Sequence, residues 1–178
     1  MGRFDGTKTL ENLKTAFAGE SQARNKYTYY ASQAKKEGYE QIAAVFTETA
    51  DNEKEHAKRL GKFLGIIEDT VTNLQHAAEG ENYEWTTMYK EFEATAREEG
   101  LNDVAEVFKH IGLAEVEHEN RFLKLKENII EGKVFVKDAP TKWKCRNCGY
   151  VHEGNEAPQA CPACAHPQAY FEMLLENY

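Results

Sequence analysis

Through residues 1–139, apolar positions recur every three to four residues among charged ones, a period typical of amphipathic helices. Ile42, Val45, Phe46 and Thr49 show this spacing. Proline is absent from this part of the chain, which suits long helices because proline interrupts them. A glycine follows each periodic stretch and can stop the helix there: Gly38, Gly65, Gly100 and Gly132. The pattern predicts four helices, at about residues 7–37, 39–64, 72–99 and 102–130.

The helical pattern ends before Pro140, and cysteine, proline, glycine and aromatic residues take over from there. The short β-branched stretch 132–136 is typical of an extended connector. We therefore predict a mainly α chain of two domains, with a helical bundle over residues 1–138 and a small β and loop domain over residues 139–178.

An internal repeat relates the two halves of the helical part. Glu53 and His56 recur as Glu115 and His118, 62 positions further on. Residues three apart lie on one face of a helix, so each copy presents a carboxylate beside an imidazole. The repeat predicts a duplicated helical hairpin with equivalent residues opposite one another. Other residues match at the same offset: Tyr27 with Tyr89, Val45 with Val107, Phe46 with Phe108, and Arg59 with Arg121.

Further glutamates lie level with these pairs in the first and third predicted helices. Glu20 precedes Gly38 by 18 residues and Glu53 follows it by 15, which correspond to about 27 and 23 Å of helix. In the second half, Glu81 and Glu84 lie at a similar level. The candidate metal ligands of the helical part are all glutamates or histidines: Glu20, Glu53, His56, Glu81, Glu84, Glu115 and His118.

This ligand set favours a pair of metal ions. Oxygen-rich ligation with one imidazole per metal suits non-haem iron or manganese. One glutamate from each of two helices and Glu-x-x-His from each of the other two is the di-iron carboxylate pattern. A single Glu-x-x-His in a charged helix more often lies on a solvated face, but a second copy at matching height favours a metal site. Three neighbouring acids, Glu55, Glu117 and Glu119, fall on other faces, where we expect solvent.

The repeat is imperfect in the third helix. Glu20 precedes Tyr27 by seven residues, whereas Glu81 precedes Tyr89 by eight. One extra residue predicts a π-bulge, a feature often found at functional sites. Glu84 has no acidic counterpart in the first half, so it is a surplus carboxylate available for ligand exchange. The two tyrosines either donate hydrogen bonds to the site carboxylates or are ordinary core residues.

All four cysteines lie in the tail, as two Cys-x-x-Cys pairs. Cys145, Cys148, Cys161 and Cys164 predict a tetrahedral metal site with four sulfur ligands. Zinc would make this tail a structural ribbon, and iron would make it a one-electron carrier. So short a domain needs a metal to fold, and we expect Trp143, Tyr150 and Phe171 to form a small aromatic core.

Charge and composition exclude several partners. The net charge is −8, from 30 acidic and 22 basic residues, and no basic stripe is present, so nucleic acid is not an expected partner. No stretch reaches the ~18 apolar residues of a membrane span, and the polar N-terminus is unlike a signal peptide. Cysteine pairs spaced for metal rather than for disulfides indicate a reducing compartment, the cytoplasm.

Taken together, these motifs resemble the rubrerythrin family along essentially the whole chain. The resemblance implies a ferritin-like four-helix bundle followed by a rubredoxin-like domain. It also implies two non-haem iron ions in the bundle and one iron in the four-cysteine site. The residues that carry it are Gly19-Glu20, Glu53-x-x-His56, Gly80-Glu81-x-x-Glu84, Glu115-x-x-His118, Cys145-x-x-Cys148-Gly149-Tyr150 and Cys161-Pro162-x-Cys164.

The resemblance assigns roles to these ligands. Glu53 and Glu115 would bridge the two irons, with Glu20 on one iron and Glu81 and His118 on the other. The first iron would take a histidine when reduced and the surplus glutamate when oxidised. The candidate catalytic residues are therefore the exchanging pair and the two repeated tyrosines: Glu84, His56, Tyr27 and Tyr89.

The function implied by the resemblance is a peroxidase that reduces hydrogen peroxide to water in defence against oxidative stress. Electrons would come from NAD(P)H through a separate reductase or a rubredoxin and pass through the four-cysteine iron. One alternative is a ferroxidase or iron-handling protein of ferritin type, although iron storage needs no dedicated electron donor. Another is a binding module with zinc in the tail.

The connection between the second and third helices is short. If the hairpins are related by a pseudo-two-fold axis, the chain must return roughly 30 Å along the bundle after the second helix. Residues 65–72 span at most about 27 Å when fully extended. We therefore expect a homodimer in which the first hairpin of one chain packs with the second hairpin of another.

Overall fold

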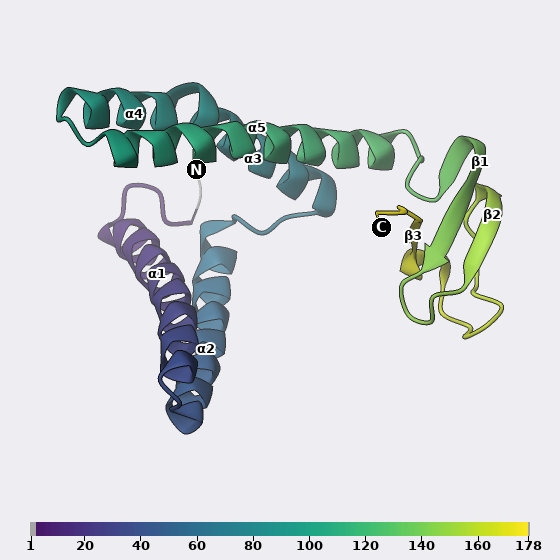
Figure 1. Ribbon diagram of the computed structural model, residues 1–178, viewed down its shortest axis with the longest axis horizontal. Helices are drawn as coiled ribbons and strands as arrows, with labels where there is room; N and C mark the ends of the chain where they lie inside the picture. The colour runs from purple at the N-terminus through teal and green to yellow at the C-terminus, as the bar shows by residue number, and fades with distance from the viewer. Residues whose placement is uncertain (1–2, 178) are drawn as a thin grey trace. The chain divides into compact units, whose positions relative to one another are not determined.

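A computed structural model describes residues 3–177 of the chain. Between Asp69 and Thr70 the chain divides into two compact units, each built around a helical hairpin (Figure 1). The second unit also contains a small three-stranded sheet. The mainly α class predicted from the sequence is confirmed.

The first unit is a hairpin of α1 (Lys8–Lys36) and α2 (Glu40–Leu64). Thr7 caps α1, because its hydroxyl accepts a hydrogen bond from the Leu10 amide at 3.2 Å. The two helices pack through small side chains, with Ala31, Ala34 and Ala43 buried against Phe46. Small residues at the contact let the two backbones approach closely. Helix α2 ends at Gly65 in the left-handed conformation, as the sequence predicted.

The second unit repeats this hairpin with one difference. Its first arm runs through α3 (Thr70–Tyr83), a π-helical turn η1 (Glu84–Met88) and α4 (Tyr89–Glu98). Its second arm is α5 (Asn102–Ile130), with the predicted bounds. The predicted π-bulge is therefore confirmed. Helix α3 begins at Thr70, slightly earlier than expected, which shortens the connection from α2.

The duplication extends to the packing of the two hairpins. Ala34 and Ala43 of the first hairpin correspond to Ala96 and Ala105 of the second, and all four are buried. Aromatic rings pack in two equivalent groups: Tyr27, Tyr30 and Phe46 in one hairpin, and Tyr89, Phe92 and Phe108 in the other. In both groups, the centroids of the first ring and the third lie 6.1 Å apart. The sequence repeat is thus a structural repeat.

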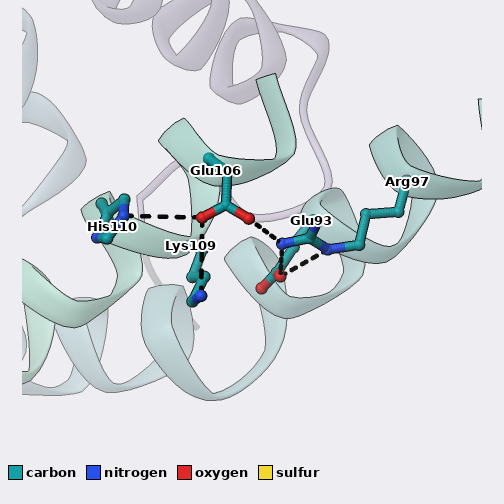
Figure 2. A network of polar contacts seen from close by, with 5 residues as sticks. All are labelled: Glu93, Arg97, Glu106, Lys109 and His110. Atoms are coloured by element: carbon teal, nitrogen blue, oxygen red, sulfur yellow. Dashed lines mark hydrogen bonds and ion pairs between the residues drawn. The ribbon is translucent and has the colours of Figure 1, made fainter. Parts of the chain in front are cut away.

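A polar network on the surface joins α4 to α5 (Figure 2). The Arg97 guanidinium donates to Glu93 at 2.7 Å and to Glu106 at 2.6 Å. Lys109 and His110 lie on the other side of the Glu106 carboxylate, at 3.6 and 3.7 Å. Arg97 therefore links the two arms of the hairpin close to its turn.

The tail folds into an antiparallel sheet with the order β2-β1-β3, made of β1 (Val136–Cys145), β2 (Val151–Glu156) and β3 (Phe171–Met173). A short 3-10 helix, η2 (Gln168–Tyr170), precedes β3. The predicted aromatic core is present, with Trp143 and Phe171 buried beside two cysteines and Ala157. The predicted boundary between residues 138 and 139 falls within β1.

Candidate functional site

The first unit brings three predicted ligands together. Glu20 projects from α1, and Glu53 and His56 project from α2. His56 Nδ1 lies 2.8 Å from a Glu53 oxygen and 3.5 Å from a Glu20 oxygen. The height argument made from the two antiparallel helices is therefore correct within this hairpin.

The second unit contains the equivalent cluster. Glu81 comes from α3, and Glu115 and His118 come from α5. His118 Nδ1 lies 2.5 Å from a Glu115 oxygen and 3.6 Å from a Glu81 oxygen. Glu115 is 8% exposed and is the one charged residue that is buried in the described part of the chain. A buried carboxylate is costly unless a cation or a hydrogen bond compensates it.

In both clusters, a neighbouring carboxyl helps to raise the pKa of one glutamate. A hydrogen bond with Glu53 raises the pKa of Glu20 and lowers the pKa of Glu53. The hydrogen bond with Glu53 also raises the pKa of His56. In the second cluster, desolvation and then the hydrogen bond with Glu115 raise the pKa of Glu81. Glu20 and Glu81 are therefore protonated more readily than an isolated glutamate.

Both clusters fit a divalent metal ion. In each, one atom from every residue lies within 4.8 Å of the others, so a single ion can contact all three. Two carboxylates and one imidazole form a donor set of the type that non-haem iron and manganese take. A divalent cation would offset the negative charge of the two carboxylates.

Glu84 occupies a different position from the other predicted ligands. It is the first residue of η1, and among residues 3–177 it does not join the cluster of Glu81, Glu115 and His118. Its charge still acts on the site, because it contributes to the raised pKa of Glu81 and of Tyr89. Glu84 therefore lies close to the second cluster but outside it.

The two repeated tyrosines pack in the aromatic groups described above. For Tyr89, desolvation is the largest cause of a raised pKa, followed by the charges of Glu84, Glu115 and Glu81. The Tyr89 hydroxyl is therefore held in its neutral form beside the second cluster. Tyr27 occupies the equivalent position in the first hairpin, with its ring 6.1 Å from the ring of Phe46.

The four cysteines form a second metal-type cluster in the tail. The sulfur atoms of Cys145 and Cys164 lie 3.8 Å apart, and those of Cys148 and Cys161 lie 3.6 Å apart. A tetrahedron with metal–sulfur bonds of about 2.3 Å has edges of about 3.8 Å. All four thiols are free, and these separations are too long for disulfides. The sulfur positions therefore fit one tetrahedral metal ion.

Backbone amides act on the pKa of two thiols in this sulfur cluster. The amide of His166 lowers the pKa of the Cys164 thiol to about 6. The amide of Tyr150 acts in the same direction on Cys148, but hydrogen bonds with the other sulfurs, first Cys164, and desolvation outweigh it and raise the pKa of Cys148 to about 12. Four thiolates at these separations need a cation to coexist.

One prediction about the surrounding acids is wrong. Glu119 was expected to lie in solvent, but it is half-buried and accepts hydrogen bonds from Asn82 and Trp85. Glu55 and Glu117 are exposed, as expected. The repeat contains a signal for Glu119, because the equivalent residue of the first half is Ala57. A polar residue that replaces a buried alanine of a repeat indicates a new contact.

None of the helices within residues 3–177 combines the length and the apolar character that crossing a membrane requires.

The chain matches two known families in succession. Residues 11–126 match the family described as Rubrerythrin, and residues 143–172 match the rubrerythrin rubredoxin-like domain. The chain is 54% identical to Rubrerythrin of Nitratidesulfovibrio vulgaris, over the whole of both chains. It is 54% identical to Rubrerythrin of Porphyromonas gingivalis, over 97% of this chain and 93% of the relative. Nigerythrin of Nitratidesulfovibrio vulgaris is 38% identical over 92% of this chain and 85% of its own.

Proposed function

Because the chain belongs to the rubrerythrin family, we propose that it is a peroxidase that reduces hydrogen peroxide to water in defence against oxidative stress. The observation that carries this proposal is the presence of two kinds of metal site on one chain. A sulfur-only site suits electron transfer, and an oxygen-rich site suits binding and reduction of an oxygen compound. A chain that only stored iron would have no use for the first.

The cofactors are two non-haem iron ions at the carboxylate site and one iron at the four-cysteine site. When bound, the iron pair supplies the two electrons that peroxide reduction consumes. The chain's own contribution is to hold these ions and to manage protons. The residues that we propose as ligands are those of the three clusters with the addition of Glu84: Glu20, Glu53, His56, Glu81, Glu84, Glu115, His118, Cys145, Cys148, Cys161 and Cys164.

The overall reaction takes one hydrogen peroxide, two electrons and two protons to two water molecules. We propose that Tyr89 and Tyr27 hold protons near the site, since burial and nearby carboxylates keep the Tyr89 hydroxyl neutral. The charge of Glu84 acts on Glu81 and Tyr89, which supports its proposed role as a ligand that joins the site by moving. We further propose the exchange of His56 for Glu84 when the iron is oxidised.

Electron supply completes the proposal. Electrons derived from NAD(P)H would reach the four-cysteine iron from a separate reductase or rubredoxin. The functional domains would be residues 1–138 and 139–178. The chain would act in the cytoplasm, because free thiols of this kind persist in a reducing compartment.

We also propose a homodimer with exchanged hairpins. A single-chain bundle related by the pseudo-two-fold axis would have α2 parallel to α3, with Glu53 level with Glu81. Glu53 to Leu64 and Thr70 to Glu81 each cover 11 helical steps, so the connection would have to return about 33 Å along the bundle. The connecting residues 65–69 span at most about 22 Å between the two helix ends. The first hairpin of one chain can therefore complete the site with the second hairpin of its partner more easily than with its own.

Stopped-flow measurement on the anaerobically reduced, iron-loaded protein tests the peroxidase. Peroxide is expected to restore the absorbance of the oxidised four-cysteine iron far faster than dioxygen does. Equal rates with the two oxidants would favour the ferroxidase alternative instead. A colourless tail that holds zinc would contradict electron transfer through it.

A variant tests the role of Glu84. Glu84→Ala is expected to lower the rate of peroxide reduction by at least about tenfold, because it removes one proposed ligand of the oxidised iron. Glu91→Ala changes an exposed acid of α4 and serves as the matched control. An unchanged rate in Glu84→Ala would remove this residue from the mechanism.

A further inference from the structure

Glu119 uses both of its carboxylate oxygens to hold the segment that contains the π turn. Its Oε1 accepts a hydrogen bond from the Asn82 side-chain amide at 3.0 Å. Its Oε2 accepts one from the Trp85 indole N–H at 2.5 Å. Asn82 lies in the last turn of α3 and Trp85 lies in η1, so the two donors lie on either side of the start of the π turn. Glu119 therefore ties this part of the first arm to α5.

The other hairpin provides an internal comparison. At the offset of the repeat, Ala57 occupies the position of Glu119, and it is 8% exposed. Helix α1 runs from Lys8 to Lys36 without a π turn. The carboxylate that ties the two arms is thus present in the hairpin that has the extra residue and absent from the hairpin that lacks it. This pairing links Glu119 to the π turn rather than to helix packing in general.

A second difference between the hairpins also accompanies the π turn. Tyr89 directly follows the turn, and its Cβ packs against Gly112 of α5. A Cβ added at Gly112 would lie 3.2 Å from the Cβ of Tyr89, a tight contact. The equivalent residue of the first hairpin is Ala50. Helix α5 therefore differs from α2 at two positions that face the altered arm.

The π turn needs such contacts because a helix alone does not determine where an extra residue is accommodated. The π-helix is a rare form, found mostly as single turns at functional sites. Inside the turn, the Thr86 hydroxyl donates to the Asn82 carbonyl at 2.6 Å, a kind of bond that weakens and bends a helix locally. The contacts to α5 hold the turn from outside, and Glu84 is its first residue.

We propose that Glu119 is a positioning residue that holds the π turn against α5 and thereby keeps Glu84 beside the metal site. Its carboxylate receives two donors from the altered arm, one on each side of Glu84 in the sequence. The effect on catalysis rests on the proposed role of Glu84, whereas the effect on the π turn does not. Two separate measurements distinguish these parts.

The first measurement uses amide hydrogen exchange of the full chain with diamagnetic zinc in its metal sites. Glu119→Ala is expected to speed exchange of the amides of residues 84–89 by at least about tenfold, the loss expected when a hydrogen bond to a charged group is removed. The NMR resonance of the Trp85 indole N–H should move toward that of a solvent-exposed indole. Glu106→Ala is the matched control, since Glu106 is also a carboxylate of α5 that accepts a hydrogen bond from the opposite arm (Figure 2). Equal effects in the two variants would overturn the proposal.

The second measurement uses the iron-loaded protein and peroxide reduction. Glu119→Ala is expected to lower kcat with little change in KM, and Glu106→Ala is expected to change neither. Glu119→Gln should recover most of the loss, because its amide can accept from Trp85 and donate to a rotated Asn82 side chain. No recovery with Gln would show that the charge of Glu119 matters rather than its geometry, and would overturn the positioning role.

Two further outcomes separate the parts of the proposal. If Glu119→Ala does not fold, Trp85→Phe removes one of the two donors, keeps an aromatic side chain, and should also increase exchange in this segment. If hydrogen exchange changes as expected but wild-type protein reduces no peroxide, the proposed function fails while the effect of Glu119 on the π turn holds. Faster exchange with an unchanged kcat would contradict the effect on Glu84.

Discussion

At the residue scale, the two cysteine-containing turns of the tail differ in one informative position. After Cys148 the chain passes through Gly149 with φ 79°, and after Cys164 it passes through Ala165 with φ 57°. In this conformation the amides of Tyr150 and His166 hydrogen-bond to the cysteine sulfurs. Among the described residues other than glycine, Ala165 alone has a positive φ. The left-handed conformation costs an alanine roughly 1–2 kcal/mol.

Exchanging these two residue types tests that cost. Gly149→Ala is expected to lower the free energy of unfolding of the iron-loaded tail by about 1 kcal/mol, since the added Cβ meets no atom within 4 Å and only the backbone is strained. Ala165→Gly is expected to change it by less than about 0.5 kcal/mol, because relief of strain is offset by the greater freedom of glycine in the unfolded chain. Guanidinium titration followed by the absorbance of the tail iron measures both. A large loss in Ala165→Gly would contradict this account.

At the element scale, the hairpin of α4 and α5 depends on charge near its turn. The hydrogen bond from Arg97, followed by the charge of Lys109, lowers the pKa of Glu106. A lowered pKa in the folded state means that this pair stabilises the fold above the ordinary glutamate range. That contribution disappears as the pH falls through the lowered value.

An NMR titration of the Glu106 carboxyl carbon checks the direction of this shift. The pKa of Glu106 is expected to lie below the ordinary glutamate value and to rise in Arg97→Gln, which removes the first cause. Lys14→Gln, a change in the other hairpin, is the control and should leave the titration unchanged. An unchanged pKa in Arg97→Gln would assign the shift to Lys109 and His110 instead (Figure 2).

The small sheet is the element that depends most on its metal. Two of the five residues in its buried core are the cysteines Cys145 and Cys161. The metal ligands are therefore also part of the hydrophobic core. Removing the metal leaves four thiols that repel once they ionise, around a core too small to fold unaided.

Removal of the tail iron is therefore expected to unfold residues 136–173 and to leave α1 to α5 helical. Heteronuclear NMR would show the loss of dispersion for Trp143, whose indole N–H donates to the Gly154 carbonyl in the folded tail. Far-UV circular dichroism should retain its helical signal. A tail that kept the Trp143 resonance without metal would contradict the dependence on metal.

At the scale of the whole molecule, the proposed hairpin exchange has a direct genetic test. Glu53→Ala damages the first hairpin, and Glu115→Ala damages the second. In an exchanged dimer that contains one chain of each type, both damaged hairpins meet at one site and both intact hairpins meet at the other. Random mixing should restore about a quarter of the sites, since half of the dimers are mixed and half of their sites are intact.

Co-expression followed by iron analysis and peroxide assay measures this recovery. A mixture of Glu53→Ala with Glu20→Ala is the control, because both changes lie in the first hairpin and no pairing of chains restores an intact site. Recovery in the first mixture but not in the second supports the exchange. Absence of recovery in both mixtures, with stable dimers present, would contradict it.

Much of this protein follows from local patterns in its sequence. The period of apolar residues predicted the bounds of the helices because a helix repeats every 3.6 residues. The spacing of Glu53 and His56 placed both on one helix face, and equal distances from a turn predicted which glutamate lies level with them. Counting one extra residue between Glu81 and Tyr89 predicted the π turn. Each of these inferences needs only distances along the chain.

Tertiary structure determined the contacts that depend on how one helix is rotated against another. Glu119 was expected in solvent because it falls on a different helix face from the predicted ligands, whereas both of its donors come from a segment more than 30 residues away. The separation of Glu84 from the cluster of Glu81, Glu115 and His118, and the close contact of Gly112 with Tyr89, are likewise set between helices. Sequence periodicity determined which residues share a face, but only packing between elements determined which faces meet and at what distance.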